Sequence, residues 1–340
     1  MLAMLLALAA AAGFGGSDFA AGLAARGTSV IRVTIMAEVT GAVLGLMIVP
    51  WLSVRAPSAA DAGWGAAAGV SGVIGAMALY LGFRHAAFSV ASTLSAVGSA
   101  ALSVLAGLLF GERPGGLSLA GIALALPAIV AVSASPGWRP RPGRRAQPEP
   151  ITQREPGTQP EPSAQPGLLP HVEPGPRPER GPEPEPGPGQ AQRARPAHTG
   201  RHLAGVGYGL VAGAGFALYF IGLSRAGQGA GLWPVLVAQL TALAVAAGAG
   251  VVTGQLRLPP AGTLPLAALT GVAGVAGTAC FFLATHAGLL AVTAVITSLY
   301  PAGTIMLARV LLGERITLVR LAGLLLAAGS VVLIAVGGTG

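Results

Sequence analysis

Residues 104–113 read Val-Leu-Ala-Gly-Leu-Leu-Phe-Gly-Glu-Arg, and residues 306–315 read Met-Leu-Ala-Arg-Val-Leu-Leu-Gly-Glu-Arg. A shift of 202 residues aligns these two stretches without a gap. The same shift superimposes further glycine positions, which pair as Gly13 with Gly215, Gly69 with Gly271, Gly72 with Gly274 and Gly75 with Gly277. One register that holds over three separated stretches indicates an internal duplication. The chain therefore reads as a first repeat over 1–136 and a second repeat over 202–340.

The composition of the two repeats is that of a membrane protein. Hydrophobic residues make up 53% of the chain and charged residues only 9%, which is far from the average of soluble domains. The 20 basic residues are all arginine, and ten of them lie in residues 137–201. The high isoelectric point thus comes mainly from this segment, and no basic stripe interleaved with aromatic residues indicates nucleic-acid binding. We expect an integral membrane protein in a lipid bilayer, with no nucleic-acid partner.

Residues 137–201 have a different composition from the repeats. Seventeen of these residues are proline, and the segment alternates Pro-Glu and Pro-Arg pairs with a single aromatic residue, Trp138. Such a segment cannot bury enough apolar surface to offset the entropy lost on ordering. We expect a disordered linker between the repeats, with a docking segment for a proline-recognising partner as the alternative.

Hydropathy divides each repeat into five runs long enough to cross a bilayer. The expected spans are 2–25, 30–49, 62–83, 90–110 and 117–133 in the first repeat, and 203–223, 232–252, 264–285, 292–312 and 318–336 in the second. The fold class is therefore an all-α polytopic membrane protein with ten transmembrane helices. Because five is odd, the second repeat must enter the membrane from the opposite side, which is the inverted arrangement of many transporters.

The motifs resemble those of a known family. Each repeat closes with Leu-x-Gly-Glu-Arg followed by a Leu-Ala-Gly-x-x-Leu run, and residues 14–26 read Phe-Gly-Gly-Ser-Asp-Phe-Ala-Ala-Gly-Leu-Ala-Ala-Arg. This pattern resembles the EamA-type transporters of the drug/metabolite transporter superfamily. The resemblance implies a secondary transporter in the plasma membrane, with a central solute cavity lined by helices one, three, four, six, eight and nine. Members export or exchange amino acids, metabolites or drugs, so the solute stays open.

The orientation in the membrane has two conflicting indicators. Span counting predicts that both termini lie on one side and the linker on the other. Family members usually keep both termini in the cytoplasm, which favours an external linker. The arginines that flank the linker favour the opposite orientation by the positive-inside rule. The resemblance decides weakly for cytoplasmic termini.

Two carboxylates lie inside predicted spans. Asp18 is in the last third of the first span and Glu38 in the first half of the second, so both lie about 10–12 Å below the same loop at 1.5 Å per residue. Acidic residues inside a membrane are costly and are usually functional. We interpret the pair as a candidate proton or cation coupling site, with neutralisation by Arg26 or Arg32 as the structural alternative. The matching positions of the second repeat, Phe220 and Leu240, carry no acid.

Polar residues of the third, fourth and ninth spans are the candidate solute contacts. They are Tyr80, Ser95, Ser99, Thr297 and Tyr300. The Tyr300-Pro301 dipeptide is expected to interrupt the ninth span and to free backbone carbonyls beside a cavity. The alternative is that the hydroxyl groups bond only to their own helices.

The repeated Gly-Glu-Arg motif ends the fourth and ninth spans. Glu112, Arg113, Glu314 and Arg315 lie beside glycine at helix ends, which fits helix caps and interhelical ion pairs. We interpret these four residues as structural, with a gating contact as the alternative.

The most probable function class is thus a secondary transporter of a small-molecule solute that works by alternating access, with proton-coupled export as one form. No phosphate-binding loop or cluster of metal ligands occurs, and Cys280 is the single cysteine, so no cofactor and no metal are expected. The alternative is a membrane-embedded structural module or an intramembrane enzyme, although no catalytic constellation is recognisable. The protein is expected to act alone or as a homodimer.

Overall fold

The computed structural model describes residues 1–52, 55–85, 88–133, 196–313 and 317–337. Helices form all its regular structure in these residues. The first repeat consists of five helices, α1 (Leu2–Ala24), α2 (Val30–Leu52), α3 (Ala59–His85), α4 (Phe88–Leu109) and α5 (Gly116–Ser133). All five agree with the predicted spans to within a few residues.

The second repeat has the same order of helices with one interruption. It consists of α7 (Pro196–Arg225), the short η1 (Gln228–Ala230), α8 (Trp233–Val252), α9 (Leu264–Ala287), α10 (Leu290–Thr297), α11 (Tyr300–Leu312) and α12 (Leu318–Gly337). The break between α10 and α11 falls at Ser298 and Leu299, and Pro301 lies in the first turn of α11. Proline is tolerated in a first turn but cannot continue a preceding helix, so the predicted interruption of the ninth span is confirmed.

The length and composition of these helices fit a membrane. Ten segments are long and apolar enough to cross a bilayer, with α10 and α11 counted together as one. The chain is a multi-pass membrane protein, as its composition predicts. Residues 137–195 of the expected linker lie outside the described residues. The last part of the range expected for the linker is instead helical, because α7 begins at Pro196.

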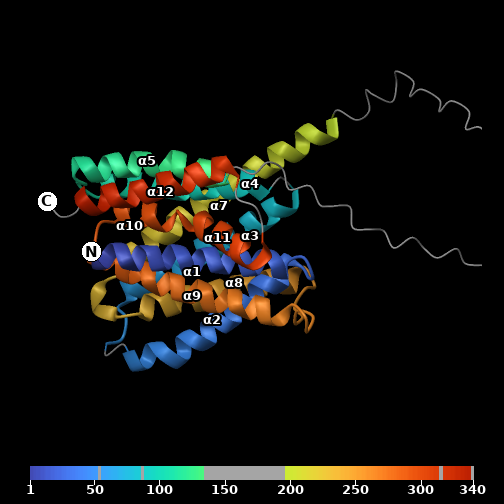
Figure 1. The fold of residues 1–340 in the computed structure, drawn as a ribbon. Coiled ribbons are helices and arrows are strands. Elements are labelled where there is room, and N and C mark those ends of the chain that lie inside the picture. The colour runs from blue at the N-terminus through green and yellow to red at the C-terminus, as the bar shows by residue number, and fades with distance from the viewer. Residues whose placement is uncertain (53–54, 86–87, 134–195, 314–316, 338–340) are drawn as a thin grey trace, which may run out of the picture. The chain divides into compact units, whose positions relative to one another are not determined.

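Residues 1–137 and 198–340 form one compact unit, in which the two repeats interlock. Extensive contacts join α1 to α9, α5 to α12 and α3 to α8, which are contacts between repeats (Figure 1). Each repeat therefore buries its helices mainly against the other repeat. Each buried hydrophobic cluster of the described residues combines side chains of both repeats.

Glycines permit close contacts between helices of the two repeats. A Cβ atom on Gly13 of α1 would lie 2.8 Å from the Cα of Gly277 on α9, and one on Gly215 of α7 would lie 2.8 Å from the Cα of Gly75 on α3. These two contacts are equivalent under the 202-residue shift. In lipid, helices associate through close van der Waals packing, so the duplicated glycines account for the interlocked repeats.

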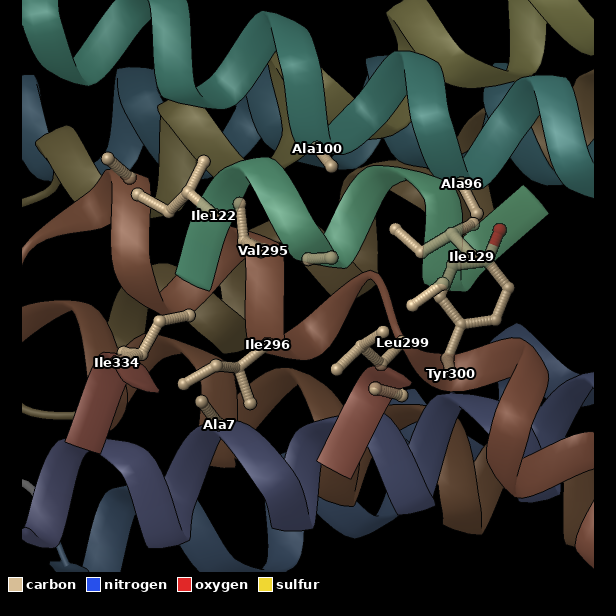
Figure 2. Packing of buried hydrophobic residues seen from close by; sticks show 14 of the residues in the cluster. Ala7, Ala96, Ala100, Ile122, Ile129, Val295, Ile296, Leu299, Tyr300 and Ile334 are labelled. Carbon is tan, nitrogen blue, oxygen red and sulfur yellow. The ribbon is translucent and has the colours of Figure 1, made fainter. Parts of the chain in front are cut away.

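The break in the ninth span lies in a buried cluster. Val295, Ile296 and Leu299 extend from α10 and its end into the space between the surrounding helices (Figure 2). Their neighbours there are Ala7 of α1, Ala96 and Ala100 of α4, Ile122 and Ile129 of α5, and Ile334 of α12. The alanines leave room for the interrupted helix, whose side chains fill the centre of the cluster.

The two ends of the bundle can be told apart by their residues. At one end Ala3 lies beside Gly288 and Gly337 lies beside Ser118. We call this the terminal end, because α1 begins and α12 finishes there. At the opposite end, called the loop end, Gly27 lies beside Thr263. The placement of both chain ends together agrees with the prediction from span counting.

Candidate functional site

A cavity lies between the two repeats in the middle of the bundle. Its volume is about 130 Å³, which is enough for several water molecules or a small solute. Residues of α1, α2 and α3 line one part and residues of α7, α8 and α9 line the other, with Tyr300 at the start of α11. Both repeats therefore contribute to a single site.

Both predicted carboxylates line this cavity. Asp18 comes from α1 and Glu38 from α2, and both lie toward the loop end of their helices. Neither Arg26 nor Arg32 lines the cavity, and the Nε of Arg32 has no hydrogen-bond partner among the described residues. The structure thus brings the two acids together and places both arginines outside the site.

Glu38 has a hydrogen-bond partner in Gln239, which lies one position before Leu240, the expected counterpart of Glu38 in the second repeat. The side-chain nitrogen of Gln239 on α8 donates hydrogen bonds to the Glu38 carboxylate and, at 3.3 Å, to the Glu38 backbone carbonyl. Both residues line the cavity. A carboxylate and a carboxamide from the two repeats therefore face each other across the site.

The repeats are related by a different shift in their second helices. Gly69 of α3 approaches the carbonyl of Ala238, whereas its counterpart Gly271 approaches the carbonyl of Ala37. The shift that relates α2 to α8 is therefore 201 residues, which also pairs Glu38 with Gln239. The expected counterpart of Glu38, Leu240, is corrected to Gln239.

Four hydroxyl groups that line the cavity donate their protons to backbone carbonyls. Ser17 donates to the carbonyl of Thr270 at 3.0 Å, Thr34 to Val30 at 3.0 Å, Thr270 to Leu266 at 2.9 Å and Thr278 to Gly274 at 2.9 Å. Because Thr278 already donates to Gly274, Tyr219 must be the donor in its 2.5 Å hydrogen bond to Thr278. The free lone pairs of these hydroxyls act only as acceptors.

Aromatic rings form the wall of the cavity nearer the terminal end. Phe14, Tyr219 and Phe220 line it, and Phe220 packs at 4.3 Å between ring centres against Phe281 behind it. Phe220 also lies 5.8 Å from Tyr219 and 6.2 Å from Phe14. The two acids thus lie toward the loop end and these three rings toward the terminal end, whereas Tyr80 and Phe216 line the cavity nearer the loop end.

The predicted solute contacts divide into two groups. Tyr80 and Tyr300 line the cavity and are almost fully buried, with 9% and 5% of their surfaces exposed. Ser95, Ser99 and Thr297 do not line it. Ser95 lies 3.4 Å from the Tyr300 hydroxyl, Ser99 lies 3.2 Å from the hydroxyl of Ser298, and Thr297 donates to the carbonyl of Ala7 at 3.4 Å. These three residues join helices, and only Ser95 touches a residue of the site.

Glu112 caps a helix of the other repeat. Its carboxylate oxygens accept hydrogen bonds from the backbone N–H groups of Leu290 at 2.6 Å and Ala291 at 2.9 Å. These N–H groups open α10, and the positive end of a helix dipole favours a negative charge there. Arg113 is exposed, whereas Glu314 and Arg315 lie outside the described residues. Glu112 therefore has a structural role as the N-terminal cap of α10. The predicted ion pairs of the Gly-Glu-Arg motifs remain a prediction.

Sequence reasoning missed several residues of the site. Gln239 could have been found only by allowing a gap in the repeat alignment. Thr278 carries no motif and lies on a helix whose polar residues are few. Tyr219, in contrast, is one of the tyrosines that the sequence places on the solute path, and it does line the cavity. In the described part of the chain, no group of three His, Cys, Asp or Glu side chains could hold a metal ion.

Comparison with known proteins gives the family. Residues 203–336 match the model of the EamA-like transporter family. This match confirms the resemblance drawn from the motifs, and the family is one of membrane transporters. No curated protein matches the chain significantly.

The fold of the chain also occurs in a solved structure, titled only "Crystal structure of protein". That structure matches with a TM-score of 0.66 at 14% identity, over 98% of this chain and 96% of the other. At such low identity the match concerns the fold alone. It extends over both repeats, whereas the family match covers the second.

Proposed function

We propose that this protein is a secondary transporter that moves a small solute through the central cavity by alternating access. The observation that carries the proposal is the cavity itself, which both repeats line and which holds Asp18 and Glu38. Inverted repeats that meet at a central site allow one repeat to rock against the other and to expose the site to each side in turn. The plasma membrane is the proposed location.

The two carboxylates are the proposed coupling site. Charged groups inside a membrane are rare, and proton pathways are among their principal uses. Asp18 has no hydrogen-bond or ionic partner among the described residues, and Glu38 is held by the amide of Gln239. A protonated carboxyl is neutral and can cross with the moving cavity, so a pH gradient could drive transport.

Transport in proteoliposomes tests this proposal. The purified protein is reconstituted and uptake of a metabolite panel is measured with and without an imposed pH gradient. We expect gradient-driven movement of at least one solute, and we expect D18N and E38Q to abolish the driven mode while solute exchange at equal pH persists. Full pH-driven transport by both variants would contradict the coupling role and would leave a facilitator or exchanger. Failure of every solute to move in any mode would contradict the transport function.

A further inference from the structure

We infer that the solute bound in this cavity is a small organic cation, an ammonium compound with N–H donors, and that Asp18 is its counter-ion. This inference rests on the proposed transport function and adds the chemical class of the solute. Four features of the cavity support it, and each concerns a different part of the lining.

The first feature is the charge of the lining. Two residues that line the cavity carry carboxylates, and the described lining includes no Arg, Lys or His. An anionic solute would meet two like charges without a basic side chain to compensate its own. An amino acid zwitterion would leave its carboxylate equally unpaired, and burying an unpaired charge is strongly unfavourable.

The second feature is a group of hydroxyl and amide oxygens that can act only as hydrogen-bond acceptors. Ser17, Thr34, Thr270 and Thr278 all donate to backbone carbonyls, so they offer only lone pairs to a solute. The nitrogen of Gln239 donates to Glu38, which leaves the amide oxygen to accept. A solute that brings its own N–H donors satisfies these acceptors, whereas one that brings further acceptors does not.

The third feature distinguishes the two acids. Glu38 already receives the Gln239 amide, so a solute would have to share that carboxylate. Asp18 has no hydrogen-bond or ionic partner in the described part of the chain, and it lines the cavity directly. A hydrogen bond to a charged group is stronger than one between neutral groups. The unengaged carboxylate of Asp18 is therefore where an ammonium group gains most.

The fourth feature is the aromatic wall. The rings of Phe14, Tyr219 and Phe220 line the part of the cavity that is nearer the terminal end than Asp18 is. Aromatic faces attract cations and also pack against apolar groups. A solute with an ammonium group at one end and an aromatic or aliphatic body at the other matches both sides of the site.

Binding of four probes of nearly equal size tests the solute class. They are 2-phenylethylamine, which is cationic at neutral pH, 2-phenylethanol, which is neutral, 3-phenylpropionate, which is anionic, and phenylalanine, which is a zwitterion. Affinities are measured by isothermal titration calorimetry on the purified full chain in detergent at pH 7. We expect the cation to bind at least about tenfold more tightly than each of the others, since a hydrogen bond to a charged group contributes about 1.5–3 kcal/mol.

Three variants test the counter-ion. D18N is expected to weaken binding of 2-phenylethylamine about tenfold or more and to leave 2-phenylethanol unchanged. Exchange of a cationic solute by D18N at equal pH then persists only at a correspondingly higher solute concentration. E38Q should weaken it less, because the Glu38 carboxylate is shared with Gln239. D61N removes a carboxylate that lies on α3 outside the cavity lining and serves as the matched control. Size-exclusion chromatography and thermal unfolding verify that each variant is folded.

Two outcomes would overturn the inference. One is equal or tighter binding of the neutral, anionic or zwitterionic probe by the unaltered protein. The other is a folded D18N variant that binds the cation as tightly as the unaltered protein does. Because these measurements report binding, they are independent of the transport assay. A protein that transports other solutes but fails this test keeps the proposed function and loses the cationic solute.

Discussion

The first helices of the two repeats, α1 and α7, share their packing and differ in chemistry. Gly13 of α1 and Gly215 of α7 make equivalent close contacts with α9 and α3. A few residues further along each helix, α1 presents Ser17 and Asp18 to the cavity where α7 presents Tyr219 and Phe220. The duplicated sequence thus retains the contacts that assemble the bundle, while the side chains that face the cavity have diverged.

The second helices show a subtler form of the same difference. Glu38 of α2 and Gln239 of α8 are nearly equal in size, occupy equivalent positions and bond to each other. A symmetric pair of carboxylates would repel in so confined a space, and a symmetric pair of amides would carry no charge. The difference teaches that the repeats use pseudo-symmetry for packing and asymmetry for charge.

The largest expected effect comes from breaking the shared packing. In G13V and G215V, the added Cβ would lie 2.8 Å from a backbone Cα atom of the opposite helix, so the helices must separate. We expect each variant to lose at least about 1–3 kcal/mol of stability and to yield little monodisperse protein. The matched controls are G22V and G207V, since a Cβ on either glycine meets nothing within 4 Å. A normal melting temperature for G13V would show that this contact is not essential.

The second prediction concerns the asymmetry of charge. Q239E places a carboxylate opposite Glu38 and removes the donated hydrogen bond, at a cost of about 1–3 kcal/mol. At low pH the two groups can share a proton, and at high pH both are ionised and repel. We therefore expect the melting temperature of Q239E to fall relative to the unaltered protein as pH rises from 5 to 9.

The double variant E38Q/Q239E sharpens this test because it moves the acid to the other repeat. It rebuilds one carboxylate and one amide at the same positions, so we expect it to recover most of the stability lost in Q239E. A double variant as unstable as Q239E would mean that the surroundings of α2 and α8 are not equivalent.

A smaller effect is expected at the duplicated Gly-Glu-Arg motif. E112Q removes the negative charge that faces the first N–H groups of α10, which should cost about 1 kcal/mol. Thermal unfolding measures the loss. The same change at Glu314 extends the comparison to the second repeat, and an equal loss there would indicate an equivalent cap. No loss in E112Q would contradict the capping role.

The smallest effect separates helix packing from solute binding. S99A removes the hydroxyl that lies 3.2 Å from Ser298, at a cost of about 0.5–1.5 kcal/mol. Because Ser99 does not line the cavity, the affinity for a bound solute should stay unchanged. Y300F, which alters a residue of the cavity, is the contrasting variant. A loss of affinity in S99A would return Ser99 to the solute site.

Most of the fold followed from the sequence because membrane helices have a strong signature. Long apolar runs and a duplicated register predicted ten spans, and Tyr300-Pro301 predicted the interruption of the ninth. The start of α7 at Pro196 was not predicted, because residues 196–201 share their polar composition with the segment before them. Proline is also favourable in the first turn of a helix, so its presence did not separate helix from linker.

The candidate site was predicted only in part. Asp18 and Glu38 were found because acids inside apolar spans are conspicuous. Serines and threonines are not, since the same side chain either faces a cavity or bonds to a neighbouring helix, as Ser95 and Thr297 do. Helix rotation decides between these roles, and it depends on glycine contacts between repeats that a single sequence does not specify.

The cap on α10 has a consequence for the order in which the protein is made. Glu112 is synthesised 178 residues before Leu290, whose backbone N–H it accepts. The first repeat therefore lacks these two backbone donors to Glu112 until α10 of the second repeat has been synthesised. Completion of α10 then supplies the missing donors, so this contact is a late step of biogenesis. In a chain truncated before α10, Glu112 would have no helix N-terminus to cap.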